Sequence, residues 1–167
     1  MARKTRGREA ASAPASNDAS LARNREALHD YAVEDRFEAG IVLTGSEIKS
    51  IRTGRVSLRE GFVRVKDGEA WLEGVHIAPY EYGTYLNHEP VRARKLLLHK
   101  NELHEIGTRT HASGYTVIPL HLYLKNGRAK VEIGLARGKR QYDKRQAIAE
   151  RESKREIARE MRARDRD

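Results

Sequence analysis

Three histidines lie close enough in the sequence to suggest a metal site, but their spacing does not support one. His99, His104 and His111 are separated by five and seven residues, so they do not align on one face of a helix, and no His-Glu-x-x-His zinc helix is present. The chain contains no cysteine, which excludes disulfides, thiolate zinc sites and cysteine nucleophiles. We therefore expect neither a metal ion nor another cofactor.

A glycine-containing segment in the last third of the chain only superficially resembles a phosphate-binding loop. Three residues instead of four separate Gly134 from Gly138, and Arg140 stands where a serine or threonine would hold magnesium. Serine, histidine and aspartate all occur, but no local motif marks a nucleophile. These observations predict that the protein is not an enzyme.

Three side chains that point outward from predicted strands could instead contact a nucleic acid. Glu38 could accept a hydrogen bond from the amino group of a cytosine, although a surface salt bridge is the commoner explanation for such a residue. Leu97 alternates with Leu96 and Leu98 and could pack against an unstacked base, or it could be buried in the core. Lys130 faces away from its apolar neighbours, where a phosphate contact and plain solvation explain it equally well.

The net charge of +9 is concentrated at the two ends of the chain. Residues 1–25 hold six basic and two acidic residues, and residues 139–167 hold eleven basic and seven acidic residues. The body between them is therefore nearly neutral. Basic arms gain affinity for polyanions by releasing counterions from phosphates, although a pair of solubilising tails would have the same composition.

A long strand and short helices are expected to position the outward side chains. Residues 31–43 alternate apolar and polar side chains with a single break at Asp35, which predicts a strand that presents the acidic candidate outward. Residues 44–47 have the pattern of a capping box and predict a short helix after that strand. A second helix is expected at residues 101–106, ending at Gly107.

Two turn sequences predict β-hairpins. Asp67-Gly68 and Asn126-Gly127 each supply the positive φ of a type I′ turn between two extended segments. Pro119 lacks an amide proton, so its strand must lie at an edge or contain a bulge there. Many antiparallel strands with short helices between them predict a mainly β fold. We expect a small closed antiparallel barrel resembling an oligonucleotide-binding fold, with embedded short helices.

The composition of the chain changes near both ends of this predicted barrel. We expect a disordered basic arm at residues 1–23, a β-barrel domain at residues 24–138 and a basic tail at residues 139–167. The tail contains few large apolar residues, so burial cannot offset the entropy lost in ordering it. We hypothesise that it is disordered when free and helical against an anionic surface.

Several short segments, taken in order and at their spacing, are specific for one protein family. They are Phe37–Gly40, Gly45–Ser50, Ile77–Tyr80, Arg94–Leu98, Lys130–Ala136, Gly138–Arg140 and Asp143–Arg145. From about Asn24 to Arg145 the chain resembles the small protein B family, the SsrA-binding proteins of bacterial trans-translation. The resemblance continues loosely through the tail.

The resemblance implies an RNA-binding adaptor. A barrel would bind the transfer-RNA-like domain of transfer-messenger RNA (tmRNA, or SsrA), and a tail would enter the empty messenger channel of a stalled ribosome, which is rescued while its incomplete protein is tagged. Alanyl-tRNA synthetase and elongation factor Tu are implied as partners through the RNA. No apolar run reaches the roughly 20 residues of a membrane span, and we expect a cytoplasmic monomer. A general single-stranded RNA-binding barrel remains the alternative.

The resemblance also assigns roles to individual residues. The RNA-contacting glutamate, leucine and lysine of the family match Glu38, Leu97 and Lys130. A second basic cluster, which we expect to face phosphates, consists of Arg92, Arg94 and Lys95. At the start of the tail, a glycine would permit entry into the ribosome, and a tyrosine, where some members have histidine, could stack on a base. The residues assigned to the ribosome are Gly138, Lys139, Arg140, Tyr142, Asp143, Lys144 and Arg145.

Overall fold

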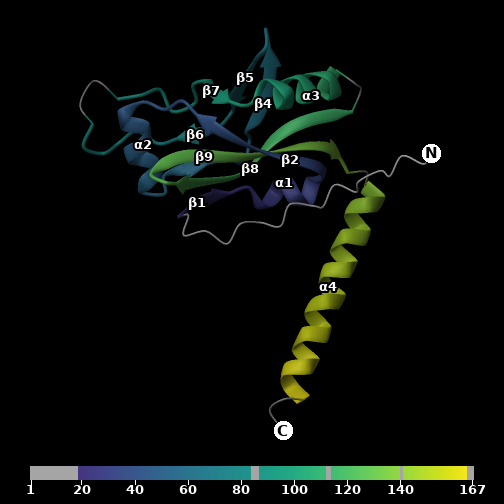
Figure 1. Ribbon diagram of the computed structural model, residues 1–167. Helices are drawn as coiled ribbons and strands as arrows, with labels where there is room; N and C mark the ends of the chain where they lie inside the picture. The colour runs from purple at the N-terminus through teal and green to yellow at the C-terminus, as the bar shows by residue number, and fades with distance from the viewer. Residues whose placement is uncertain (1–18, 84–86, 112–113, 140, 165–167) are drawn as a thin grey trace, which may run out of the picture.

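The computed structural model describes residues 19–83, 87–111, 114–139 and 141–164 (Figure 1). Seven antiparallel strands form one sheet, in the order β1 (Ser20–Arg23), β8 (Tyr115–Lys125), β9 (Arg128–Gly138), β2 (Tyr31–Ile41), β7 (Arg94–Leu97), β5 (Glu69–Glu73) and β4 (Phe62–Lys66). A small second sheet pairs β3 (Val56–Ser57) with β6 (His76–Ile77). The helices are α1 (Arg25–Asp30), α2 (Gly45–Arg52), α3 (Lys100–His111) and α4 (Gln141–Arg164). The expected mainly β class is confirmed.

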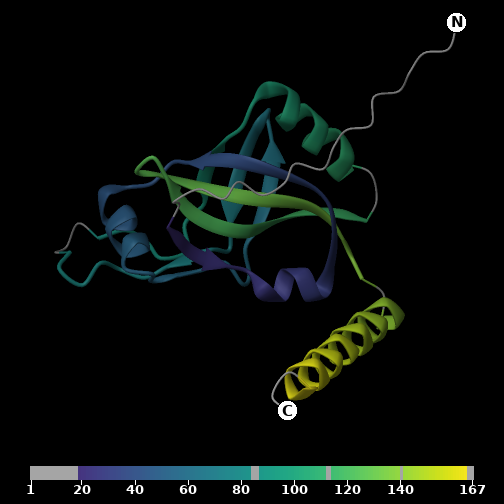
Figure 2. The ribbon, with the colours of Figure 1, turned by 60° about the horizontal axis from the view of Figure 1, so that its bottom comes forward.

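The large sheet curls around its core but does not close by hydrogen bonds. Strands β1 and β4 are its two ends, and within the described ranges no strand pair joins them to complete a ring. The strands nevertheless wrap around a common interior (Figure 2). A Cβ atom added to Gly61, just before β4, would lie 2.7 Å from the ring of Pro119 on β8. Within the described residues the two chains pack against each other here without pairing as strands, and the predicted closed barrel is not confirmed.

Both predicted hairpins are present, as β4–β5 and β8–β9. Their turn residues have the positive φ that a type I′ turn requires, with values of 53° and 72° at Asp67 and Gly68 and of 51° and 73° at Asn126 and Gly127. The register of β8 against β9 shifts immediately after Pro119, so the bulge predicted as one of two alternatives is the one observed.

Strand β2 lies in the middle of the sheet and carries the expected alternation. Ala39 is fully buried, whereas Glu38 is exposed. The register against β9 shifts between Val33 and Asp35, at the residue where the sequence pattern breaks. The facing strand β9 buries Val131, and its further alternate residues fill the core under β2. Side chains of the opposite parity therefore point away from the core on both strands.

Helix α3 is longer than its sequence predicts. It continues past Gly107 to His111, although glycine has a low helix propensity. Ile106 is fully buried, and a Cβ atom at Gly107 would lie only 3.6 Å from Val65 on β4. Tertiary packing of this face stabilises the helix beyond the glycine, which local propensity alone did not indicate.

The first strand corrects the predicted boundary of the N-terminal arm. Residues 20–23 form β1 instead of disordered chain, with Ala22 opposite Leu122 and Arg23 opposite His121 on β8. This pairing satisfies backbone groups along an edge of β8 that would otherwise be open. Residues 1–18, the rest of the predicted arm, lie outside the described residues.

Candidate nucleic-acid interface

Four positions form one row across the outer face of the sheet. Leu97 on β7 pairs in register with Gly40 on β2, Gly40 pairs with Lys130 on β9, and Lys130 pairs with Tyr123 on β8. Their neighbours along each strand are buried, namely Leu96, Ala39, Val131 and Leu122. Because side chains alternate along a strand, the row points outward and joins two of the three sequence-predicted RNA contacts.

Gly40 allows Leu97 to extend across the row. A Cβ atom added to Gly40 would lie 3.3 Å from the Cβ atom of Leu97 and 3.5 Å from its Cδ1 atom, which is a crowded contact. Leu97 is 56% exposed, so the prediction that it faces outward is confirmed and the alternative of core burial is wrong. An apolar side chain held on a polar surface is suited to pack against an unstacked base.

Glu38 lies beside the row and is held by donors from β8. Its carboxylate accepts hydrogen bonds from the hydroxyl group of Tyr123 and from Nζ of Lys125, at 3.0 Å for the Oε2 atom. Nζ of Lys130 is 3.8 Å from Oε1. The sequence pattern did not reveal the roles of Tyr123 and Lys125, although their alternation with Leu122 in the predicted hairpin places them on the same face.

These partners keep Glu38 ionised. The hydrogen bond from Tyr123, together with Lys125 and Lys130, holds the pKa of this carboxyl below its ordinary value of 4.5, against the opposing effect of burial. An ionised carboxylate only accepts hydrogen bonds, and its two oxygens can serve several donors. About a third of the side chain stays accessible. The site therefore offers a fixed acceptor to a base edge, an apolar leucine and two ammonium groups to phosphates.

Arg94 does not belong to this surface, which corrects the prediction that it faces a phosphate. The side chain is completely buried. Its Nε atom donates to Oε1 of Glu47 on α2 at 2.8 Å, and its NH1 group donates to the carbonyl oxygen of Val75 at 2.8 Å. On β7 it has the same parity as Leu96, which points inward. The guanidinium is retained in the core because a carboxylate and several carbonyl groups surround it.

Glu47 is the common acceptor of a polar cluster that also contains Arg92 and Arg94. It accepts hydrogen bonds from Arg92 at 2.8 Å, from Arg94 and from the backbone amide of Thr44 at 2.7 Å, the last as the predicted capping box requires. Burial by itself would raise the pKa of Glu47, but these donors bring it below the ordinary value of 4.5. The cluster thus joins α2 to β7 and restrains Arg92, which is only partly exposed.

Lys95 is the member of the basic cluster that lies on the outer face. It has the same parity as Leu97 on β7 and forms an ion pair with Glu69 on β5. Exposed pairs of this kind contribute little stability, so the ammonium group can exchange its partner for a phosphate. Only this residue of the predicted cluster extends the row of Leu97.

The start of the tail is attached to α1. Gly138 ends β9 in an exposed position, and a Cβ atom there would meet nothing within 4 Å. The amide of Lys139 donates to the carbonyl oxygen of Asp30 at 2.8 Å, and its Nζ atom donates to that of Leu28 at 3.0 Å. These contacts place a cation at the end of α1, where free carbonyl groups favour it. Arg140 lies outside the described residues.

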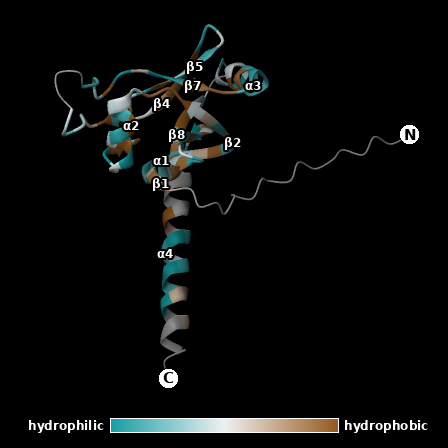
Figure 3. Ribbon diagram, turned by 60° about the vertical axis from the view of Figure 1, so that its left-hand side comes forward, coloured by the Kyte–Doolittle hydropathy of each residue, from teal (hydrophilic) through white to brown (hydrophobic). Residues whose placement is uncertain are grey.

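Beyond this point the tail forms the single helix α4, which extends away from the sheet (Figures 1 and 2). The predicted ribosome contacts from Tyr142 to Arg145 lie in its first turns. Hydrophilic residues predominate along it (Figure 3), and its large apolar side chains are exposed, namely Ile148, Ile157 and Met161. Within the described chain, neither α4 nor any other helix is long and apolar enough to cross a membrane.

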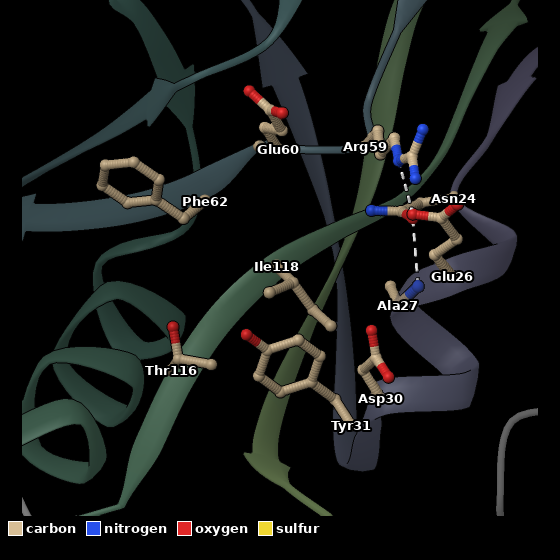
Figure 4. A pocket seen from close by; sticks show the side chains of 11 residues that line it. Asn24, Glu26, Ala27, Asp30, Tyr31, Arg59, Glu60, Phe62, Thr116 and Ile118 are labelled. Carbon is tan, nitrogen blue, oxygen red and sulfur yellow. Dashed lines mark hydrogen bonds and ion pairs between the residues drawn. The ribbon is translucent and has the colours of Figure 1, made fainter.

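One groove of the molecule is lined by residues that hold α1 on the sheet (Figure 4). It lies between α1, the residues before β4, and β8. The buried Asn24 caps α1 by accepting from the amide of Ala27 at 3.0 Å, and its Nδ2 atom donates to the carbonyl oxygens of Leu58 and Pro119 at 3.0 and 3.2 Å. These bonds fix α1 on the sheet.

Among the residues that the structure describes, no group of three or more acidic or histidine side chains could hold a metal ion.

Comparison with known proteins gives one consistent result. The model of the SmpB family, described as SmpB protein, matches residues 21–163. A protein named SsrA-binding protein from Roseiflexus sp. (strain RS-1) is 61% identical over 147 residues, covering 87% of this chain and 93% of that protein. A protein of the same name from Staphylococcus aureus (strain JH1) is 56% identical over 145 residues, with 87% and 94% covered.

The fold has a match among solved structures as well. A chain described as "tmRNA-SmpB: a journey to the center of the bacterial ribosome" superimposes with a TM-score of 0.62 at 47% sequence identity. The match covers 76% of this chain and 93% of that chain. Both sequence and fold therefore point to the same group of proteins.

Proposed function

The chain belongs to the SmpB family, and we propose that it binds the transfer-RNA-like domain of tmRNA and carries this RNA to stalled ribosomes. Its relatives are named for SsrA binding, and its structural relative is named for tmRNA and the bacterial ribosome. The role is that of an RNA-binding adaptor in ribosome rescue and tagging of the incomplete protein. We propose no catalytic step for the chain itself.

The outer row of the sheet, with Glu38 beside it, is the observation that carries this proposal. An ionised glutamate held by Tyr123 and Lys125 provides a fixed acceptor. Leu97 provides an exposed apolar contact, and Lys130 provides a cation for a phosphate. A phosphate contact alone would not distinguish one RNA from another, whereas an acceptor and an apolar side chain at fixed positions can.

We assign the ribosome contact to the tail. Helix α4 contains more basic than acidic residues, and its residues 148–159 and 161 are exposed. The attachment of Lys139 to α1 fixes the position from which the tail starts. In the proposed complex, residues 139–167 occupy the empty messenger channel. The ribosome contacts at the start of this tail include Tyr142, Asp143, Lys144 and Arg145. Two modest contacts, one to each partner, then act together only on a stalled ribosome with tmRNA.

The remaining partners follow from the RNA. We propose that alanyl-tRNA synthetase and elongation factor Tu meet this protein through the bound RNA. We further propose a monomer in the cytoplasm. Sedimentation of the free protein would check the monomer.

Removal of all residues after Gly138 is expected to leave the affinity for tmRNA within about threefold. The candidate RNA contacts lie on the sheet, and we expect the exposed charges of the tail to contribute little to RNA affinity. Both the full chain and the truncated chain should prefer tmRNA to an equal mass of unstructured RNA at physiological salt, in a mobility-shift titration. Equal binding of both RNAs, lost on truncation, would instead indicate a basic tail attached to an uninvolved sheet.

The isolated tail, residues 139–167, is expected to show little helix in plain buffer by circular dichroism. Its apolar side chains bury little surface, and isolated helices of this kind are marginal in water. Addition of a polyanion such as heparin should raise the helical signal, because phosphate-like charges neutralise the repulsion between Arg151, Arg155 and Arg159. A strong helical signal without polyanion would count against coupled folding of the tail.

A further inference from the structure

The only tryptophan of the sequence lies on the outer face of the sheet. Trp71 is the central residue of β5, and its neighbours Ala70 and Leu72 are each only 1% exposed. By alternation its indole ring projects on the side away from the core, where it is half-buried among its neighbours. The core does not need this ring, because it is filled by the opposite parity of β5.

Trp71 continues the candidate RNA surface without a break. It pairs in register with Lys95 on β7, which precedes Leu97 on the same face, and with Arg64 on β4. A continuous outward path therefore runs from Leu97 to Lys95, Trp71 and Arg64, across three adjacent strands that lie together in Figure 1. An RNA held on the row of Leu97 would extend toward this ring.

Cations flank the indole ring on both neighbouring strands. Lys95 forms an ion pair with Glu69, and NH2 of Arg64 lies 3.0 Å from Oε2 of Glu73. The guanidinium of Arg64 also lies 5.9 Å from the ring centre of Phe62, which is 39% exposed. Such surface pairs are weak, so an incoming phosphate can replace the carboxylates. An aromatic ring between replaceable cations is the arrangement with which proteins bind unpaired nucleotides.

We propose that Trp71 stacks on an unpaired base of the same RNA that the Glu38 site binds, with Lys95 and Arg64 contacting the adjoining phosphates. This contact rests on the proposed function and extends its interface over β5 and β4. A protein partner could also contact outward-facing aromatic side chains, but it would not explain why Trp71 continues the outward row that contains Leu97 and Lys130. The contact adds affinity for the RNA independently of the tail.

Because Trp71 is the only tryptophan, its fluorescence reports on this one position. Titration of the full chain with the transfer-RNA-like domain of tmRNA, followed in parallel by mobility shift, should quench the indole emission in proportion to the bound fraction. Full binding with unchanged emission would overturn the Trp71 contact and leave the proposed function in place. If the RNA did not bind at all, both proposals would fall.

Substitutions test the energetic part of the contact. Trp71→Ala is expected to weaken RNA binding by roughly 5- to 150-fold, the range that corresponds to loss of one stacked base, whereas Trp71→Phe should keep most of the affinity. The control is Tyr82→Ala, which removes an 82% exposed aromatic from the loop after β6 and should bind as the wild type does. Thermal unfolding checks that the variants are folded. Wild-type affinity in Trp71→Ala would overturn the proposal.

Discussion

Replacement of Glu47 by alanine is expected to lower the free energy of unfolding by about 3–5 kcal/mol, because it leaves a buried guanidinium without its carboxylate. Arg94 is completely buried beside Glu47, and Arg92 donates to the same carboxylate. Single domains are stable by only about 5–15 kcal/mol, so this loss is a large fraction of the total. Urea titration followed by circular dichroism measures it through the transition midpoint and slope.

The matched control is an exposed ion pair of the same chemistry. Glu26 accepts from Nε of Arg59 at 2.6 Å, and both side chains are more than half exposed. Glu26→Ala should therefore change stability by less than about 1 kcal/mol. If Glu47→Ala cost no more than Glu26→Ala, the buried cluster would not be a determinant of stability.

The same carboxylate predicts a change of stability with pH. The pKa of folded Glu47 lies below 4.5, so its contribution is complete above that value and is lost as the pH falls through the folded pKa. Glu47→Gln, which cannot ionise, should show a flatter loss of stability in that acid range. Urea midpoints measured between neutral pH and acid compare the two proteins. Parallel pH profiles would show that other groups govern acid unfolding.

Glu38→Gln is expected to weaken binding of the transfer-RNA-like domain by about 10- to 100-fold, within the roughly 1–3 kcal/mol of one specific base contact. The direction of this change distinguishes two explanations. If Glu38 only repelled phosphates, removal of its charge would strengthen binding. If its ionised oxygens accept from a base, an amide that offers one acceptor and two donors will fit worse. Mobility-shift titration at fixed salt measures the sign.

Glu132 supplies the control for this experiment. It lies opposite Glu38 in the β2–β9 register and forms an ion pair with Arg36 at 3.3 Å. Glu132→Gln removes the same charge from the same face, and we expect unchanged or slightly stronger RNA binding. Equal weakening by both substitutions would show that Glu38 has no special contact, and would leave Leu97 and Lys130 to explain the specificity.

Local patterns sufficed for the parts of the fold that depend on neighbouring residues. The alternation through residues 31–43 gave β2, and the two turn pairs gave their hairpins, because backbone sterics at positive φ act within a few residues. For Leu97 the neighbouring residues left outward exposure and core burial open, and the structure decided for exposure. The end of α3 and the existence of β1 did not, since packing against β4 and pairing with β8 involve residues far away in the chain.

Charge and alternation thus determined by themselves that Glu38 and Lys130 face outward and that the tail is basic. Only the tertiary structure decided what those side chains meet. Arg94 belongs to a basic stretch of sequence that was expected to face phosphates. It is buried instead, because α2 brings Glu47, 47 positions away in the sequence, into contact with it. Tyr123 and Lys125 reach Glu38 across β9, because the strand order brings β8 to within one strand of β2 on the same face. A single sequence records residue types, whereas the partner that decides between burial and exposure comes from the fold.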